Sequence, residues 1–343
     1  MPRLTSGSVF RFSIGLLFGL AAWDVAQSSV QAGIRAGKGF GTKVNGKKSG
    51  RCIAGICQIS GGKRSGRNKF LKFKDFDTRG SIKRVEFDTS GKRNLIVGVT
   101  SRLGSYIDKT LKMSSKANVI WMSPGGIHLG TGARFVNVPK LSLTTSSKLK
   151  FARGIFDLFK TQASALQAFN DDPLPGSLGF GEVGDLNDWL NASTDADGRV
   201  PGIQLEGIDI RIDRELFADA LDGSLEVRNS TLAVGGAEEP DARLTLTGNA
   251  VTIGAGSSLQ AQHRDGGGLI EVGGSWQNSD PAVRQAKRSI VETGALLNVS
   301  AGEFGDGGEI VVWSNINNPE SQTIVSGELR ARGGFDHGNG GRI

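Results

Sequence analysis

The chain has 343 residues, with 51 glycines, 9 prolines, 7% aromatic residues and a formal net charge of +7. This length allows either two globular domains or one elongated repeat architecture. The high glycine content and the lack of long Ala/Leu/Glu/Lys runs argue against a helical bundle, because glycine supplies the positive φ angles of tight turns between short strands. The composition predicts an all-β protein.

Residues 1–32 have the features of a secretory signal peptide. Arg3 and Arg11 provide a positive start, an apolar run follows from Phe12 to Trp23, and small residues precede a predicted cleavage between Ala32 and Gly33. The apolar run is shorter than the roughly 20 residues that a membrane-spanning helix needs, which disfavours an uncleaved anchor. We expect a mature chain without a transmembrane segment.

Cys52 and Cys57 are the only cysteines, and both lie in the exported part. An oxidising periplasm permits a local disulfide, which would stabilise the fold by about 2 kcal/mol because the closed loop is short. The alternative is a metal site, but no histidine or third cysteine lies nearby in sequence to complete a coordination shell. The pair predicts a pinned loop and no metal.

Charge is divided unevenly along the chain. Residues 35–116 contain 21 lysines and arginines against five acidic residues, whereas residues 171–243 contain 17 acidic residues against five basic ones. The basic part could meet nucleic acid, an anionic cell surface or the lumen of a transport pore, or could simply be a solvated face. The export signal argues against nucleic acid.

The C-terminal third contains a degenerate repeat. Three copies with a shared G-G-x-I ending occupy residues 266–272, 305–312 and 338–343, and short alternating segments precede them at 259–262, 297–301 and 329–332. Residues 203–205, 208–212 and 243–247 also alternate between apolar and polar. Strands and glycine turns that recur in this way predict a β-solenoid. Because the third copy stops at Ile343, where the others continue, we expect either a truncated reading frame or an artificial end of the expressed segment.

Residues 155–169 break the β pattern. Ile155, Leu158, Phe159, Leu166 and Phe169 lie close to helical spacing, and a proline-rich stretch follows. We predict one amphipathic helix here, packed on the solenoid within an excursion.

Three stretches in the first half carry specific motifs. The first follows Gly61-Gly62 and reads N-x-F-x-x-F-x-x-F, with Asn68, Phe70, Phe73 and Phe76. The second is the apolar strand 93–100 with Ser105-Tyr106-Ile107-Asp108 after it. The third begins at Ala117-Asn118 and continues through an apolar strand into Ser123-Pro124-Gly125-Gly126-Ile127.

These stretches resemble the filamentous haemagglutinin family, specifically the N-terminal two-partner secretion domain of large exoproteins and adhesins. Ser123 and Gly125 stand where many members carry asparagine. The turn remains feasible, since proline fixes φ at its first position and glycine tolerates the left-handed conformation after it. The resemblance is strong over residues 58–150 and looser over 260–343.

The resemblance implies a right-handed parallel β-helix, a single-stranded β-solenoid with an N-terminal cap. It also implies export of the unfolded chain through an outer-membrane β-barrel transporter to the medium or cell surface, where a host or cell-surface glycan or protein would be the adhesion partner. The predicted organisation is a signal peptide (1–32), a basic segment with a possible disulfide (33–57), the secretion domain (58–150), a helical or loop excursion (151–202) and further coils (203–343).

A carbohydrate-active β-helix enzyme is the alternative function. Such an enzyme needs carboxylates clustered on neighbouring coils, and the best local set is Asp209, Asp213, Glu215 and Asp219. Their spacing is that of a solvated strand edge. His128, His263 and His337 lie far apart in sequence and fit no nucleophile pattern. We therefore expect no catalytic residues, no metal and no cofactor.

Overall fold

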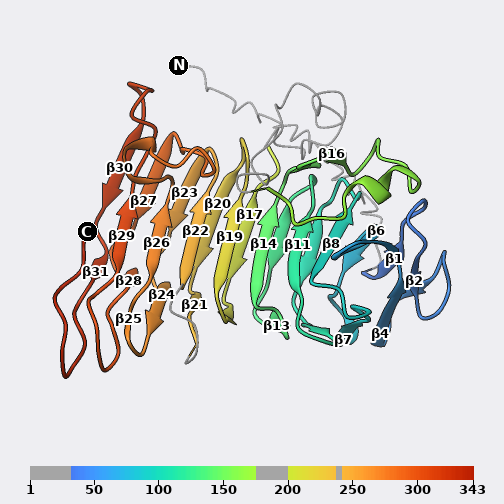
Figure 1. Cartoon of the computed structure of the whole chain (residues 1–343), viewed down its shortest axis with the longest axis horizontal. Coiled ribbons are helices and arrows are strands. Elements are labelled where there is room, and N and C mark those ends of the chain that lie inside the picture. The colour runs from blue at the N-terminus through green and yellow to red at the C-terminus, as the bar shows by residue number, and fades with distance from the viewer. Residues whose placement is uncertain (1–31, 175–199, 237–241) are drawn as a thin grey trace, which may run out of the picture. The chain divides into compact units, whose positions relative to one another are not determined.

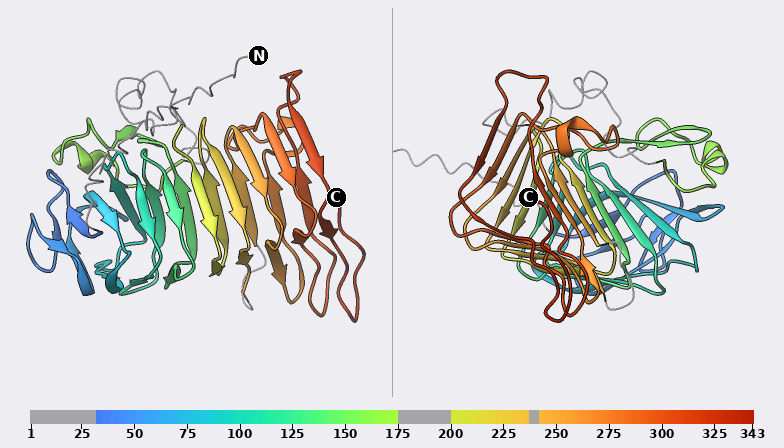
Figure 2. Two further views of the ribbon diagram at one scale, coloured as in Figure 1. Left: turned by 180° about the vertical axis from the view of Figure 1, so that it is seen from behind. Right: turned by 60° about the vertical axis from the view of Figure 1, so that its left-hand side comes forward.

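The computed structural model describes residues 32–174, 200–236 and 242–343, so the predicted signal peptide up to Gln31 lies outside the described residues. The described chain folds almost entirely as β-strands, which form three stacks of parallel strands (Figure 1). From β8 onward, each coil adds one strand to each stack, and the strands of neighbouring coils lie side by side (Figure 2). The chain is a parallel β-helix, as predicted.

The strands of each stack follow in chain order. The first stack contains β6 (Asn68–Asp77), β8 (Asn94–Val99), β11 (Asn118–Met122), β14 (Lys140–Thr144), β19 (Glu215–Asp219), β22 (Arg243–Thr247), β26 (Leu269–Val272) and β29 (Glu309–Val312). The second contains β9 (Ser105–Ile107), β12 (Ile127–Leu129), β17 (Ile203–Glu206), β20 (Ser224–Arg228), β23 (Ala250–Ile253), β27 (Arg288–Val291) and β30 (Gln322–Val325).

The third stack comes in two parts. The first part contains β4 (Ala54–Gly61), β7 (Ser81–Phe87), β10 (Thr110–Met113) and β13 (Arg134–Val136). The second contains β18 (Asp209–Ile212), β21 (Thr231–Val234), β24 (Ser258–His263), β28 (Leu296–Asn298) and β31 (Glu328–Arg330). The short β25 (Gly266–Gly267) pairs with β24.

Aliphatic side chains pile up coil upon coil inside the β-helix. One inward row of the first stack runs through directly paired, buried residues: Leu95, Val119, Leu141, Leu216, Leu244, Ile270 and Ile310. The side chains of a strand alternate between its two faces, so every second residue of each strand points inward. Each coil adds one residue to the row and packs it on the matching residue of the coil before. The burial of each coil therefore depends on its neighbours.

The predicted repeat is confirmed in register. Ile270 and Ile310, from two copies of G-G-x-I, are partners between β26 and β29, and Glu309 forms a parallel bridge with Arg342 of the third copy. In the preceding strands Leu259 pairs with Leu297, and Leu297 with Leu329. Sequence copies thus occupy equivalent positions on successive coils.

Antiparallel strands cover the first coil. They are β1 (Ile34–Ala36), β2 (Thr42–Val44), β3 (Arg51–Cys52) and β5 (Lys63–Ser65). β1 pairs with both β3 and β6, β2 pairs with β4, and β5 pairs with β6. This cap protects an edge that would otherwise be open to pairing with other chains. Cys52 on β3 of the cap and Cys57 on β4 of the third stack are both buried and are joined in a disulfide, with their Cα atoms 5.7 Å apart.

The predicted amphipathic helix over 155–169 is wrong. Residues 148–157 form a hairpin of β15 (Lys148–Phe151) and β16 (Gly154–Asp157), and only one 3₁₀ turn, η1 (Ala165–Ala168), follows. Gly154 has a φ of 132°, a conformation that suits a hairpin turn, and the Asp157 carboxylate accepts hydrogen bonds from the backbone of Phe159 and Lys160. These local turns replace the helix.

This hairpin and turn, here called the excursion (residues 145–174), cover the outer face of the first coils. They form a second apolar cluster with the outward side chains of β6, β8 and β11 and with one residue between β1 and β2. Its members are Phe40, Phe70, Ile96, Ile120, Met122, Leu149, Phe151, Phe156, Leu158, Leu166 and Phe169. Ile155, which the helical pattern placed inward, is exposed, whereas its neighbour Phe156 is buried. The apolar residues match a hairpin better than a helix.

A second long loop follows β26 and contains the 3₁₀ turn η3 (Trp276–Asn278). The Arg284 guanidinium in this loop lies 3.2 Å from the carboxylate of Asp219, which is almost completely buried at the end of β19. Burial raises the pKa of Asp219, and the charge of Arg284 opposes this shift. Of the helices in the described ranges, none reaches the length and hydrophobicity that crossing a bilayer requires.

Candidate functional site

The three phenylalanines of the N-x-F-x-x-F-x-x-F motif are all buried in the folded chain. Phe73 and Phe76 point into the β-helix, where their rings lie 5.1 Å apart and that of Phe76 lies 4.6 Å from Trp121 in an edge-to-face contact. Phe70 points outward into the excursion, with its ring 5.2 Å from that of Phe156. Each is at most 1% exposed. One strand therefore supplies aromatic residues to both apolar clusters.

An asparagine ladder links the first three coils. Asn68, Asn94 and Asn118 occupy the same position on β6, β8 and β11. The side-chain amide of Asn94 donates to the Asn68 side-chain oxygen at 2.8 Å, and that of Asn118 donates to the Asn94 side-chain oxygen at 3.0 Å. Sequence motifs flagged Asn68 and Asn118 but not Asn94. Asn94 could have been identified from the sequence, because it precedes an apolar strand just as Asn68 and Asn118 do.

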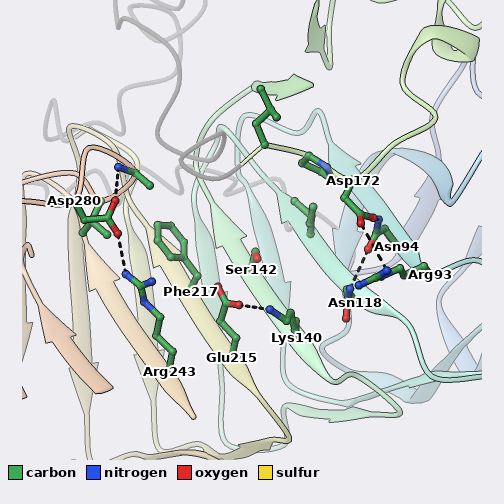
Figure 3. Close-up of a pocket in the computed structure, with 15 residues that line it drawn as sticks. Arg93, Asn94, Asn118, Lys140, Ser142, Asp172, Glu215, Phe217, Arg243 and Asp280 are labelled. Carbon is green, nitrogen blue, oxygen red and sulfur yellow. Dashed lines mark hydrogen bonds and ion pairs between the residues drawn. The ribbon is translucent and has the colours of Figure 1, made fainter. Parts of the chain in front are cut away.

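The ladder ends on the excursion. The Asn68 amide donates to the carbonyl oxygens of Phe169 and Asp171. The Asn94 amide also donates to the Asp172 carboxylate at 2.7 Å, a contact that Figure 3 shows. Although burial raises the pKa of Asp172, the hydrogen bond from Asn94 and the nearby Arg93 and Arg67 lower it overall. Asn68 of the motif thus binds the end of the excursion, about a hundred residues later in the chain.

The turn after β11 is packed between coils. The Gly126 amide donates to the carbonyl of Ser123 at 2.9 Å, and Gly126 has a φ of 105°, which favours glycine. A Cβ atom on Gly125 would overlap the carbonyl oxygen of Ser101. The Trp121 indole donates to the Ser105 hydroxyl, which donates to Ser123. Pro124 and Ile127 are also buried.

Lys69 is a buried charge that the sequence motifs do not identify. It points into the β-helix at the head of the inward row, paired with Leu95, and its side chain is completely buried. Its amine donates to the backbone carbonyl of Asp88 and to the Ser90 hydroxyl, and lies 3.3 Å from the Asp88 carboxylate. Burial lowers the pKa of Lys69, and Asp88 partly offsets the shift. The alternation of inward and outward residues along β6 places position 69 inward, and this pattern could have identified Lys69 as buried.

The predicted cleavage position lies at the start of the described chain. Ala32 is half-buried, and Gly33 is buried with its carbonyl accepting a hydrogen bond from the Asp77 amide. The cleavage itself stays a prediction.

The four carboxylates of the alternative enzyme site do not form a cluster. Asp209 lies on β18 in the third stack, whereas Glu215 and Asp219 lie on β19 in the first stack. Each of the four has a different cationic neighbour: Arg211 for Asp209, Lys116 for Asp213, Lys140 for Glu215 and Arg284 for Asp219. Among the described residues no group of three or more His, Cys, Asp and Glu side chains could hold a metal ion.

Residues 40–171 match the family model of the TPS secretion domain. The chain carries a TPS secretion domain. The matched range contains the predicted residues 58–150 and extends into the cap on one side and the excursion on the other. The chain is thus an exoprotein that leaves the cell through the outer membrane by a two-partner system, with an outer-membrane transporter as its partner.

Comparison with solved structures also found a similar chain. It is the crystal structure of the HMW1 secretion domain from Haemophilus influenzae, at 15% identity and a TM-score of 0.30, with 89% of this chain and 91% of that chain covered. No curated protein matches the chain in sequence.

Proposed function

We propose that the motif residues of the TPS secretion domain act twice, first as an unfolded segment that the transporter reads and then as the core of the first coils. The burial of the three motif phenylalanines and of Pro124 supports this proposal. A folded chain offers these side chains to no partner. Direct recognition of them therefore requires a chain that has not yet folded.

Folding outside the cell can then bias the direction of export. As each coil emerges, it buries apolar side chains against the previous one, as in the inward row from Leu95 to Ile310. The gain in free energy on each coil opposes backward movement of the chain. In this proposal no nucleotide hydrolysis is needed at the outer membrane.

A pair of matched substitutions tests the double role. Phe73→Ser and Leu244→Ser each place a hydroxyl at a fully buried inward position of the first stack, but only Phe73 lies in the motif. We expect unfolded full-length Phe73→Ser to bind the periplasmic part of the transporter more weakly, whereas unfolded Leu244→Ser binds like the wild type. Equal binding by both unfolded chains would contradict recognition of the motif.

We further infer that the exported chain contributes to attachment at the cell surface. The outer face of the third stack supports this, because Lys83, Arg84, Lys112 and Arg134 are exposed on neighbouring strands β7, β10 and β13. Such a face favours association with anionic surfaces. Adherence of cells to a host or bacterial surface, with and without the secreted chain, tests it, and equal adherence would count against it.

We propose that export and attachment, and not catalysis, are the activities of this chain. The separate ion pairs of Asp209, Asp213, Glu215 and Asp219 support this, because paired carboxylates on different stacks lack the convergence that glycoside cleavage needs. The alternative predicts cleavage of an acidic polysaccharide that Asp209→Ala abolishes. We expect neither the wild-type chain nor the Asp209→Ala variant to cleave the polysaccharide.

A further inference from the structure

The excursion lies on one defined face of the first coils, here called the seat. The seat comprises the outward residues of β6, β8 and β11, which the strand register aligns in three rows that begin at Asn68, Phe70 and Lys72 of β6. Asn68 and Phe70 are motif residues. The motif residues Phe73 and Phe76 instead point inward and are buried by the coils themselves. Coil stacking therefore buries one part of the motif, and the excursion buries the other.

The excursion supplies both apolar and polar partners to the seat. The ring of Phe70 packs 5.2 Å from that of Phe156. The Lys72 amine donates to the carbonyl of Leu158 at 2.7 Å. Gly98 is the register partner of Lys72 on β8, and a Cβ atom there would overlap the Leu158 side chain. Together with the acceptors for the asparagine ladder, these contacts show what the seat binds: apolar side chains flanked by hydrogen-bond acceptors.

The two parts of the motif are buried at different stages of chain emergence. Phe76 meets Trp121 of β11, so its burial needs only the first three coils. The residues that cover Phe70 begin at Leu149, after β14, and the acceptors for the asparagine ladder extend to Asp172. If coils form in chain order, as the proposed function holds, three formed coils still present the seat to the outside.

The transporter is the partner next to the seat at this stage. β14 ends at Thr144 and the excursion follows directly, so residues 145–174 are the next to leave the pore. The folded coils are thus tethered at the outer mouth of the transporter, and a short tether gives an effective concentration on the order of a millimolar. A weak contact with the seat is enough to be occupied under these conditions.

The contact between the excursion and the seat carries costs that favour exchange with a partner. The side-chain oxygen of Asn170 in the excursion is buried and accepts no hydrogen bond from the described residues. Burial also lowers the pKa of Lys72, an effect that the charge of Asp157 opposes. Water would solvate both groups again once the excursion leaves. The excursion can therefore be displaced more easily than a coil of the β-helix.

We propose that the excursion competes with the outer mouth of the transporter for the seat, and that its arrival releases a chain whose first coils have already formed. The transporter holds the seat with apolar side chains against Phe70 and acceptor oxygens opposite Asn68, the same groups that the excursion supplies. The inference rests on the proposed folding of coils outside the cell and deepens it, because it states how the folded end leaves the transporter.

Binding of folded full-length chains to the transporter in lipid nanodiscs tests this competition. Phe156→Ser removes a central ring of the excursion and leaves every motif residue in place, whereas Ile155→Ser changes its exposed neighbour on β16. We expect Phe156→Ser to free the hairpin, seen as faster hydrogen exchange over residues 148–157, and to bind the transporter about tenfold or more tightly than the wild type. Ile155→Ser should match the wild type in both measurements.

Gly98→Val supplies a second variant in case Phe156→Ser does not fold. Its side chain should push Leu158 off the seat and strengthen binding in the same way. A freed hairpin without stronger binding would overturn the inference. So would a hairpin that stays protected in both variants, since a segment that does not leave the seat cannot compete for it. Binding that the isolated periplasmic part of the transporter reproduces would also overturn it, because the contact is assigned to the outer mouth.

Unfolded chains separate this inference from the proposed recognition of the motif. If the unfolded wild type binds the periplasmic part but folded Phe156→Ser gains no binding to the nanodiscs, recognition stands and the competition fails. If unfolded Phe73→Ser binds the periplasmic part like the wild type while folded Phe156→Ser gains binding to the nanodiscs, the competition stands and recognition of the motif before folding fails.

Discussion

Asn68 and Asn94 lie on neighbouring coils, and the side-chain amide of Asn94 donates to the side-chain oxygen of Asn68 at 2.8 Å. The amide of Asn68 in turn donates to the backbone carbonyls of Phe169 and Asp171. The first coil is therefore completed only when the excursion reaches it. Early motif residues and the end of the excursion form one structural unit.

Removal of the Asn68 side chain should destabilise this unit strongly. In Asn68→Ala the buried carbonyl of Phe169 loses its donor, and an unsatisfied buried group costs about 1–3 kcal/mol. We expect a loss of about 2–3 kcal/mol in the free energy of unfolding, measured by urea denaturation. Asn118→Ala, at the half-buried end of the ladder, should cost about 1 kcal/mol or less. Equal losses would contradict the anchoring role of Asn68.

Replacement of Lys69 should stabilise the folded chain. Its protonated amine is buried, so Lys69→Met should raise the free energy of unfolding by about 1 kcal/mol near neutral pH. Because the folded pKa is lowered, proton binding favours the unfolded chain, and wild-type stability should rise with pH from that lowered pKa up to the ordinary value of 10.5. Urea denaturation over this range should show no such rise for Lys69→Met.

The carboxylate of Asp219 should give a pH dependence of the opposite sign. Its folded pKa is raised above 3.8, so its contribution to stability is fully present below that value and is lost as the pH rises through the raised pKa. Asp219→Asn should remove this slope, as followed by urea denaturation in mildly acidic buffers. A wild-type slope that persists unchanged in the variant would assign the effect to other groups.

Arg284 should be important for the loop after β26. Arg284→Met leaves the Asp219 carboxylate buried without this partner, which should cost about 3 kcal/mol. Hydrogen exchange should then increase in the loop and at the end of β19. Lys287→Met removes an exposed ion pair with Glu320 from the end of the same loop, and should have little effect.

The disulfide should stabilise the cap without being needed for export. Cys52→Ser/Cys57→Ser should lower the free energy of unfolding by about 2 kcal/mol, because only a short loop is closed. The medium should still contain the protein at the wild-type level. Retention of the double variant in the periplasm would instead link the cap to export.

The sequence predicted those parts of the fold that depend on local alternation. The G-G-x-I copies placed Ile270 and Ile310 on equivalent coils because turns and period-two strands repeat with them. The excursion was mispredicted because its structure follows from distant partners, such as the contact of Phe156 with Phe70. Apolar spacing alone could not distinguish this hairpin from a helix.

The candidate site was only partly predictable for the same reason. The motif identified Asn68 and Asn118, but the hydrogen bonds of Asn68 to Phe169 and Asp171 span about a hundred residues. The pocket that Figure 3 shows is lined by residues of β8, β11, β14, β19 and β22 together with residues of two separate loops. Which residues meet there depends on how the strands of successive coils are aligned, and the sequence of one segment does not determine that alignment.

Binding of the transporter's periplasmic part to full-length chain, either folded or freshly diluted from urea, tests the central claim most directly. Because Phe70, Phe73, Phe76 and Pro124 are buried after folding, we predict that the unfolded chain binds and that binding disappears at the rate at which the β-helix forms. A folded chain that binds as tightly as the unfolded one would contradict recognition of the motif before folding.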